Sequence, residues 1–163
     1  MKRRIDIYLD RQLLEISEDG EVIAGFPVST AENGPGEHLG SHCTPRGLHR
    51  IAEKIGDHAP LNAVFIGRKA TGEVWSAELS TRHPERDWIL TRILWLEGRE
   101  DGRNLGGDVD TRARFIYIHG TPDSEPMGVA ASHGCVRMMN EDVIQLFDLA
   151  DVDMDVIIHE VSP

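Results

Sequence analysis

The sequence predicts a mainly β fold, a sandwich or barrel with one clear helix at about residues 140–150. Two observations support this fold class: short runs in which apolar and polar residues alternate, and turn-forming residues between those runs. The chain has 163 residues, of which 40% are hydrophobic and 28% charged, as in ordinary globular domains. Because this length suits one hydrophobic core and no linker or repeat is visible, we expect a single domain over residues 1–163.

The N-terminal part of the chain predicts a small antiparallel meander. In Arg4 to Leu9, apolar residues alternate with polar ones, which is typical of a half-buried strand. Gln12 to Ser17 and Glu21 to Ser29 have a similar character, and Glu18-Asp19-Gly20 lies between them as a turn in which glycine accommodates a positive φ. Three consecutive strands joined by short turns are therefore expected here.

The middle and the end of the chain contain further short strand candidates. Trp88 begins the apolar run WILTRILWLEG, which we interpret as a central strand, although a buried helix also fits a run that is apolar on both faces. Phe115 to Ile118 is a shorter apolar run of the same kind. The remaining candidates are Gly47 to Ile55, Asn62 to Gly67, a short strand or hairpin arm at Gly72 to Leu79, and Met154 to Val161.

One helix and two long loops complete the predicted organisation. Asn140 is suited to cap a helix, and the acidic residues that follow it favour a first turn. Val143, Leu146, Phe147 and Ala150 then form an apolar stripe. Thr30 to Pro45 and Glu97 to Arg114 are rich in glycine and polar residues. Loops of this length in a compact domain usually have a function or are mobile, so both are candidate flaps whose role stays open.

The charge balance argues against some classes of partner. The formal net charge is −11, whereas nucleic-acid-binding proteins usually present a basic face, so we expect no nucleic-acid partner. No apolar run is long enough to span a membrane. The N-terminus is basic but lacks the apolar stretch of a signal peptide, which favours a cytoplasmic location, or a periplasmic one if a signal has been trimmed off. Two cysteines also fit a reducing compartment.

The stretch from Tyr117 to Asn140 gathers residues that could form a nucleophilic site. A cysteine attacks as its thiolate, so Cys135 needs a base, and His119, at the end of a strand, is a candidate. The amides of Gly134 and Cys135 could hold an oxyanion. Arg137 could bind a substrate carboxylate through two parallel hydrogen bonds. The residues alone leave a purely structural interpretation open, because free cysteines are often small buried hydrophobes.

A second possible site lies in the first long loop. His38, His42, Cys43 and His49 are residue types that zinc accepts. They lack the tight spacing of known zinc signatures, and histidines in a solvated loop are the simpler interpretation. We therefore expect no metal site. A regulatory disulfide between Cys43 and Cys135 is another open alternative, although spacing alone says nothing about their distance.

Two segments carry a resemblance to a known family. Residues 117–138 resemble the signature of the YkuD-type L,D-transpeptidase catalytic domain: a histidine, a loop, then Ser-His-Gly-Cys, an apolar residue and Arg or Asn. This chain has His119-Gly120-Thr121, then Ser132-His133-Gly134-Cys135-Val136-Arg137-Met138. Thr44-Pro45-Arg46-Gly47-Leu48-His49-Arg50-Ile51 resembles the family's Thr-Pro-x-Gly-x-Phe-x-Ile segment, and Val28-Ser29-Thr30 also fits. His49 departs from the pattern, since an aromatic residue is common there.

The resemblance implies roles for individual residues. Cys135 would be the nucleophile, His119 its general base, and the Gly120 carbonyl would orient the imidazole. His133 and Gly134 would shape the oxyanion site together with the Cys135 amide. Arg137 and Ser132 would contact the substrate. The resemblance implies no cofactor, and the β-rich fold agrees with that of the family.

The implied reaction is cysteine acyl transfer on peptidoglycan stem peptides. The thiolate attacks the bond between the L-centre of meso-diaminopimelate and D-alanine at position four, and D-alanine leaves a thioester behind. An amine acceptor gives a cross-link, whereas water gives a tripeptide. A cytosolic L,D-carboxypeptidase that trims soluble tetrapeptide muropeptides is therefore an alternative. A non-catalytic peptidoglycan-binding module is an alternative of another class.

Overall fold

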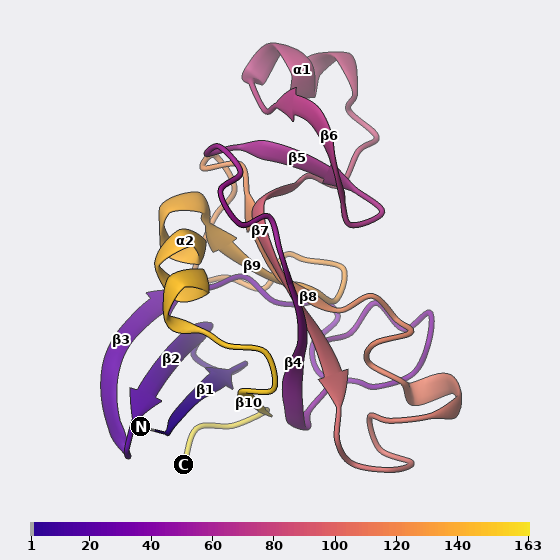
Figure 1. Cartoon of the computed structure of the whole chain (residues 1–163). Coiled ribbons are helices and arrows are strands. Elements are labelled where there is room, and N and C mark those ends of the chain that lie inside the picture. The colour runs from indigo at the N-terminus through magenta and orange to yellow at the C-terminus, as the bar shows by residue number, and fades with distance from the viewer. Residues whose placement is uncertain (1) are drawn as a thin grey trace.

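A computed structural model describes residues 2–163 as ten strands and two α-helices (Figure 1). A short 3-10 helix, η1, covers Gly107–Val109. The α-helices are α1 (Ala77–Arg82) and α2 (Asn140–Leu149). The strands are β1 (Arg3–Tyr8), β2 (Leu13–Glu18), β3 (Glu21–Pro27), β4 (Gly47–Ile55), β5 (Ala63–Ile66), β6 (Lys69–Val74), β7 (Ile89–Gly98), β8 (Tyr117–Thr121), β9 (Val136–Met139) and β10 (Asp155–His159).

All ten strands belong to one sheet, which curls around the core. The order β3-β2-β1-β10-β4-β7 continues through β5 to β6, while β8 also pairs with β7 and carries β9 at its other edge. The parallel pairing of β1 with β10 joins the two ends of the chain, and Figure 1 shows both termini close together. The prediction of a mainly β, sandwich-like or barrel-like fold is therefore confirmed.

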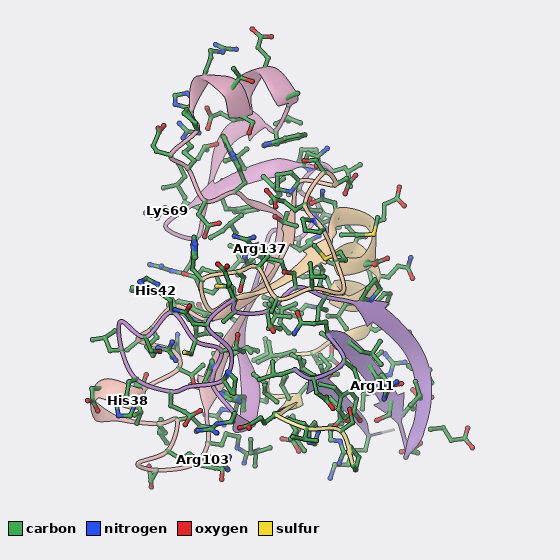
Figure 2. The ribbon with its side chains drawn as sticks, turned by 180° about the vertical axis from the view of Figure 1, so that it is seen from behind. Arg11, His38, His42, Lys69, Arg103 and Arg137 are labelled. Carbon is green, nitrogen blue, oxygen red and sulfur yellow. The ribbon has the colours of Figure 1, made fainter. Side chains whose placement is uncertain are left out.

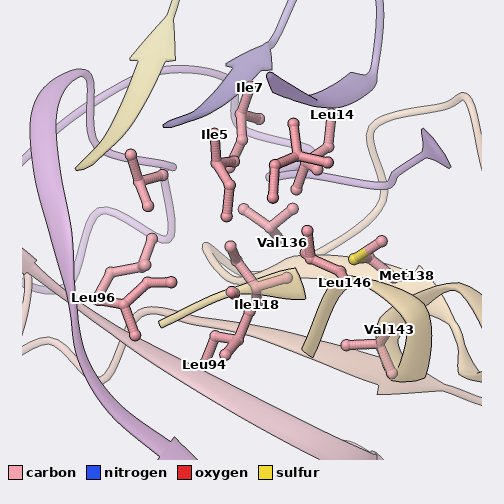
Figure 3. Packing of buried hydrophobic residues seen from close by; sticks show 14 of the residues in the cluster. Ile5, Ile7, Leu14, Leu94, Leu96, Ile118, Val136, Met138, Val143 and Leu146 are labelled. Atoms are coloured by element: carbon pink, nitrogen blue, oxygen red, sulfur yellow. The ribbon is translucent and has the colours of Figure 1, made fainter. Parts of the chain in front are cut away.

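The main core lies between the curled sheet and helix α2. Figure 3 shows side chains from the first two strands meeting those of β7, β8, β9 and α2. The apolar stripe predicted for α2 is buried as expected, and the helix packs against β7, β8 and β9. Burial of this surface is the main force that holds the layers together. The labelled core residues are Ile5, Ile7, Leu14, Leu94, Leu96, Ile118, Val136, Met138, Val143 and Leu146.

Strand β7 settles the choice left open for the run after Trp88. It is extended from Ile89 to Gly98 and pairs with β4, β5 and β8, so both of its edges are hydrogen-bonded, and most of its residues are buried. The pairing with β8 shifts between Leu90 and Ile93, and Thr91 in that interval has a φ of 73°. A bulge of this kind locally re-aims side chains, and here Thr91 hydrogen-bonds Asn140 on α2 at 2.6 Å.

Two regular elements were missed or misjudged from the sequence. Residues 77–79 are helical rather than part of a strand: α1 begins after Ser76, whose hydroxyl accepts a hydrogen bond from the Leu79 amide at 3.1 Å. This is a standard N-cap, hidden in a segment too short for a visible helical period. Strand β9 was also not predicted, because its four residues lie between a glycine-rich loop and the helix.

The prediction that Asn140 caps α2 is wrong. Met139 occupies the N-cap position without a side-chain hydrogen bond, and Asn140 is the first helical residue. Its fully buried side chain instead links Thr91 and the carbonyl of Thr121, at 2.6 and 2.8 Å. Tertiary partners replace the local cap, since a buried amide must be hydrogen-bonded.

The two long loops are joined to each other. Asn104 donates to the carbonyls of Arg46 and Leu48, at 3.0 and 3.1 Å, and the amide of Leu39 donates to the carbonyl of Asp108 at 2.6 Å. Segments 30–46 and 99–116 therefore form a single wall beside the sheet. No helix within residues 2–163 is long and apolar enough to cross a membrane.

Candidate active site

The candidate site lies on the face of β8 and β9 that points away from the main core. Strand residues alternate between faces, and Ile118 pairs with Val136 in the parallel register of the two strands, both buried in the core. The neighbouring pair, His119 and Arg137, therefore points to the opposite face. Cys135 directly precedes β9. One step of the pleat thus separates the core residues Ile118 and Val136 from His119 and Arg137.

The Cys135 thiol is held against the start of β8. Sγ lies 3.3 Å from the amide of Tyr117, which donates to it, and 3.3 Å from the carbonyl of Phe115, which accepts from it. Burial raises the pKa of this thiol to about 12, although the Tyr117 hydrogen bond and the positive charges of Arg137 and Arg114 work in the other direction. The residue as a whole keeps part of its surface exposed. Burial therefore favours the neutral thiol at Cys135.

The His119 ring is oriented by the backbone, as the family resemblance implies. Nδ1 lies 2.6 Å from the carbonyl oxygen of Gly120. A carbonyl only accepts hydrogen bonds, so Nδ1 carries the proton and Nε2 keeps a free lone pair. The ring is buried, and burial lowers its pKa. No hydrogen bond joins His119 to Cys135 within residues 2–163. The pair is thus a neutral thiol and a neutral imidazole that share one face of the sheet.

Gly120 is required beside His119 by the packing. A side chain at Gly120 would place its Cβ only 2.6 Å from the carbonyl oxygen of Leu90, and would also collide with the Asn140 amide oxygen. Contacts below 3.0 Å of this kind force the backbone apart. The bulge in β7 and the buried Asn140 therefore both pack against Gly120, the residue whose carbonyl orients the His119 ring. Neither partner was identified from the sequence.

Two hydroxyl groups, those of Ser132 and Thr44, hold the turn before Cys135. Ser132 Oγ donates to the Cys135 carbonyl at 2.6 Å and accepts from the Gly134 amide at 3.2 Å. Thr44 Oγ1 donates to the Gly134 carbonyl at 2.9 Å. The structure therefore brings the two motifs recognised in the sequence into direct contact. Ser132 is buried and engaged in these bonds, and its contact with substrate stays a prediction.

Gly134 occupies a conformation that favours glycine. Its φ is +131°, and a Cβ there would lie 3.2 Å from both the Cys43 carbonyl and Ile116 Cδ1. The turn can therefore press closely against the first long loop. Within residues 2–163, the amide of Cys135 donates no hydrogen bond. That amide is available to a substrate, whereas the Gly134 amide is already bonded to Ser132.

His133 is exposed between two small hollows. One has a volume of about 220 Å³ and is lined by His133, Arg137, Asp87 and neighbouring residues. The other, also about 220 Å³, is lined by His133, Ser132, Glu32, Asn33 and His42. The rings of His133 and His42 meet edge to face at 6.0 Å. In Figure 2, Arg137 and His42 are seen on this side of the molecule.

Arg137 is buried and already paired. Its guanidinium lies 3.1 Å from a carboxylate oxygen of Asp87, and it donates to the carbonyl of Ala131 at 3.3 Å. Asp87 raises the pKa of both His119 and Cys135, and Arg137 lowers both. Asp87 lies in the polar segment before β7 and carries no motif that could have revealed it. The substrate contact assigned to Arg137 stays a prediction.

Arg114 connects the wall of loops to the site. It donates to the carbonyls of Cys43 and Gly36, at 2.7 and 3.3 Å. Burial lowers the pKa of Arg114, while the thiols of Cys43 and Cys135 and the carboxylate of Glu37 work against that shift. An arginine stays charged in proteins, so this side chain adds positive charge near Cys135. It was not singled out from the sequence.

The residues considered for zinc are not gathered into a site. Within residues 2–163, no group of three or more histidine, cysteine or acidic side chains is arranged to hold a metal ion. Both ring nitrogens of His49 are engaged, one with the Gly47 carbonyl and one with Thr111 Oγ1. Both cysteines are free thiols, and Cys43 Sγ lies 3.6 Å from the carbonyls of Asn33 and Ser41.

Comparison with known proteins agrees with this geometry. The family model described as the L,D-transpeptidase catalytic domain, YkuD, matches residues 2–158. The chain belongs to the YkuD family of L,D-transpeptidase catalytic domains. A 48-residue stretch is also 42% identical to YqjB of Bacillus subtilis (strain 168), covering 29% of this chain and 27% of that protein.

Solved L,D-transpeptidases share the fold of this YkuD domain. A structure from Xylanimonas cellulosilytica superimposes with a TM-score of 0.56 at 21% identity, covering 97% of this chain and 60% of that one. L,D-transpeptidase 3 from Mycobacterium tuberculosis, in complex with a faropenem-derived adduct, gives 0.59 at 15% identity, covering 97% and 60%. The chain spans about three-fifths of the length of these structures.

Proposed function

We propose that this YkuD domain is a cysteine acyltransferase that acts on peptidoglycan stem peptides. The substrate bond is the amide between the L-centre of meso-diaminopimelate and D-alanine at position four. The observation that carries the proposal is that Cys135, directly before β9, and His119 of β8, which has a free Nε2, lie on one face of these paired strands. Membership of the family supplies the substrate class.

The first half-reaction forms a thioester. His119 Nε2 takes the Cys135 proton as Sγ attacks the carbonyl carbon, since the resting thiol is neutral and needs a general base. The oxyanion of the tetrahedral intermediate accepts from the free Cys135 amide. When the C–N bond breaks, His119 returns the proton to the leaving amine. Free D-alanine departs and the acyl group stays on Sγ.

The second half-reaction is set by the acceptor. An amine from a second stem peptide attacks the thioester and releases Sγ, which gives a cross-link. Water in the same position gives a tripeptide. Hydrolysis is the second candidate activity, and the two candidates share every step up to the thioester. A defined disaccharide tetrapeptide therefore separates them by its products.

Product analysis tests the proposal. Purified protein and Cys135→Ala are incubated with the disaccharide tetrapeptide and the products are separated by mass. We expect the wild type to release D-alanine and to form a cross-linked dimer, a tripeptide or both, while Cys135→Ala forms neither. A wild type that binds the peptide without turnover would support a non-catalytic binding module instead.

A β-lactam adduct gives an independent measurement of the nucleophile. A related structure contains a faropenem-derived adduct, and we propose that a penem or carbapenem acylates Cys135 of this chain. Mass spectrometry of the intact protein should show the added mass in the wild type, and in Cys43→Ala as a matched control. The adduct should be absent from Cys135→Ala. An adduct that is lost in Cys43→Ala would move the reactive thiol to the first long loop.

A further inference from the structure

Arg68 forms an unusual cluster beside the thiol. It lies in the turn between β5 and β6, where its φ is 65°, and the next residue, Lys69, is labelled in Figure 2. Its guanidinium carbon lies 4.7 Å from the centre of the Trp95 ring and 4.9 Å from that of Phe115. One nitrogen also donates to the Tyr117 hydroxyl at 2.9 Å. Two ring faces and one hydroxyl thus fix the position of the cation.

The cluster is built on the two residues that contact the nucleophile. The carbonyl of Phe115 and the amide of Tyr117 both lie 3.3 Å from Cys135 Sγ. The side chains of these same residues hold Arg68. The Arg68 guanidinium is therefore separated from Cys135 Sγ by a single residue, Phe115 or Tyr117. It lies over the ring of Trp95 on β7, and Phe115 at the end of the loop wall also holds it.

Arg68 differs from most arginines of the chain in its ionic partners. The chain is strongly acidic, and Arg137 and most surface arginines lie within 4.0 Å of a carboxylate. Arg112 stacks on the same Trp95 ring at 4.8 Å but is paired with Glu53 at 3.1 Å. Within residues 2–163, Arg68 has no carboxylate partner. Only one of its N–H groups is used, and the rest are free to donate.

The surroundings suit a ligand that is part apolar and part anionic. Phe115 is 50% exposed, although large aromatic side chains usually bury most of their surface. The partly exposed ring of Trp95 continues this apolar surface. Arginine held on aromatic rings is a preorganised fork for a carboxylate, because little side-chain entropy remains to be lost on binding.

We propose that Arg68 binds a carboxylate of the donor stem peptide, with Trp95 and Phe115 holding the guanidinium beside Cys135. The inference rests on the proposed function, since it concerns the substrate of that same site. Two carboxylates of the donor have this chemistry. One is on the D-centre of diaminopimelate, and the other is on the D-alanine that leaves. Either would form a bidentate pair with the unused N–H groups.

The test compares acid and amidated peptides in matched variants. Four proteins are used: wild type, Arg68→Gln, Arg68→Lys and Arg11→Gln. Arg11 is the control because it also stacks on an aromatic ring, 5.6 Å from Tyr8, has no carboxylate partner within residues 2–163, and lies away from the site in Figure 2. The substrates are the tetrapeptide, the same peptide amidated on diaminopimelate, and the peptide ending in D-alaninamide.

We expect Arg68→Gln to raise KM for the acid peptide about 10- to 100-fold with little change in kcat, as for loss of a charged hydrogen bond. One amidated peptide should show the same rise with the wild type and no further rise with Arg68→Gln, which identifies the carboxylate. Arg68→Lys should recover part of the loss, and Arg11→Gln should match the wild type. Equal losses on all three peptides would overturn the proposal, because they would indicate a structural role.

A binding measurement separates this inference from the catalytic proposal. In Cys135→Ala the affinity for the three peptides is measured by calorimetry, with and without Arg68→Gln. The same preference for the acid peptide should appear without turnover. If the wild type showed no turnover but the preference for the acid peptide remained, the proposed acyl transfer would be overturned and the role of Arg68 would stand. Binding that is absent, or indifferent to Arg68, would overturn the subsite.

Discussion

Strands β8 and β9 have two faces with different tasks. Ile118, Val136 and Met138 point into the core and are fully buried, as Figure 3 shows. Tyr117, His119 and Arg137 point the other way. The core face stabilises through apolar area. The site face carries a thiol and an imidazole whose burial opposes their charged forms, and the ion pair of Arg137 with Asp87. One backbone therefore serves both, and the two faces should respond differently to substitution.

The largest expected effect is on the site face. His119→Gln keeps a polar side chain of similar reach but cannot transfer a proton, so kcat/KM for the tetrapeptide should fall about 10²- to 10⁴-fold. The thiol pKa of about 12 makes the base necessary at neutral pH. Steady-state release of D-alanine measures the loss.

Two controls accompany His119→Gln. Thermal unfolding checks that the buried amide is tolerated, and His58→Gln replaces a histidine whose side chain is 93% exposed. His58→Gln should retain full activity. Activity of His119→Gln within tenfold of the wild type would contradict the assignment of the base.

The opposite response is expected on the core face. Ile118→Ala removes buried methyl groups from the centre of the cluster and should lower the free energy of unfolding by about 2–5 kcal/mol. At low temperature, where the variant stays folded, kcat should remain within a few-fold of the wild type. Chemical denaturation and D-alanine release measure the two quantities.

Ile118→Val is the milder control and should cost about 1 kcal/mol. If folded Ile118→Ala lost as much activity as His119→Gln, the two faces would not be separable. Such a result would mean that the packing of Ile118 in the core determines the position of the next residue, His119.

The same division explains how much the sequence could predict. Alternating apolar residues predicted the strands of the core face, and the helical stripe predicted α2, because these patterns are local. The motif residues predicted which side chains belong to the site face. Asp87, Arg114 and Asn140 were missed or misassigned because they act through partners distant in the chain. Strand β9 was not predicted because its four residues are too few to show an alternating pattern of apolar and polar residues.

Two buried histidines extend the comparison beyond β8 and β9. Both His49 and His119 are buried, and burial lowers the pKa of each, to about 4 for His49. His119 faces the site with one free nitrogen, whereas both nitrogens of His49 are bonded, to the Gly47 carbonyl and to Thr111 at 3.0 and 2.9 Å. His49 has no lone pair left for a substrate, so its contribution should be to stability and to its dependence on pH.

The sign of that dependence follows from the pKa shift. An unfolded histidine titrates near 6.5, and the folded state holds His49 neutral down to about pH 4. Its stabilisation is therefore present above pH 6.5 and is lost as the pH falls toward 4, by about 3 kcal/mol in total. His49→Phe has no such group, so the acid decline of its unfolding free energy should be shallower by about that amount, while its neutral-pH stability falls by about 1 kcal/mol for the lost hydrogen bonds. Urea unfolding at several pH values measures both, with His58→Gln as the exposed-histidine control. If the unfolding free energy of His49→Phe fell at low pH as steeply as that of the wild type, the pH dependence would come from His119 and the carboxylates. His49 would then contribute to stability through packing alone.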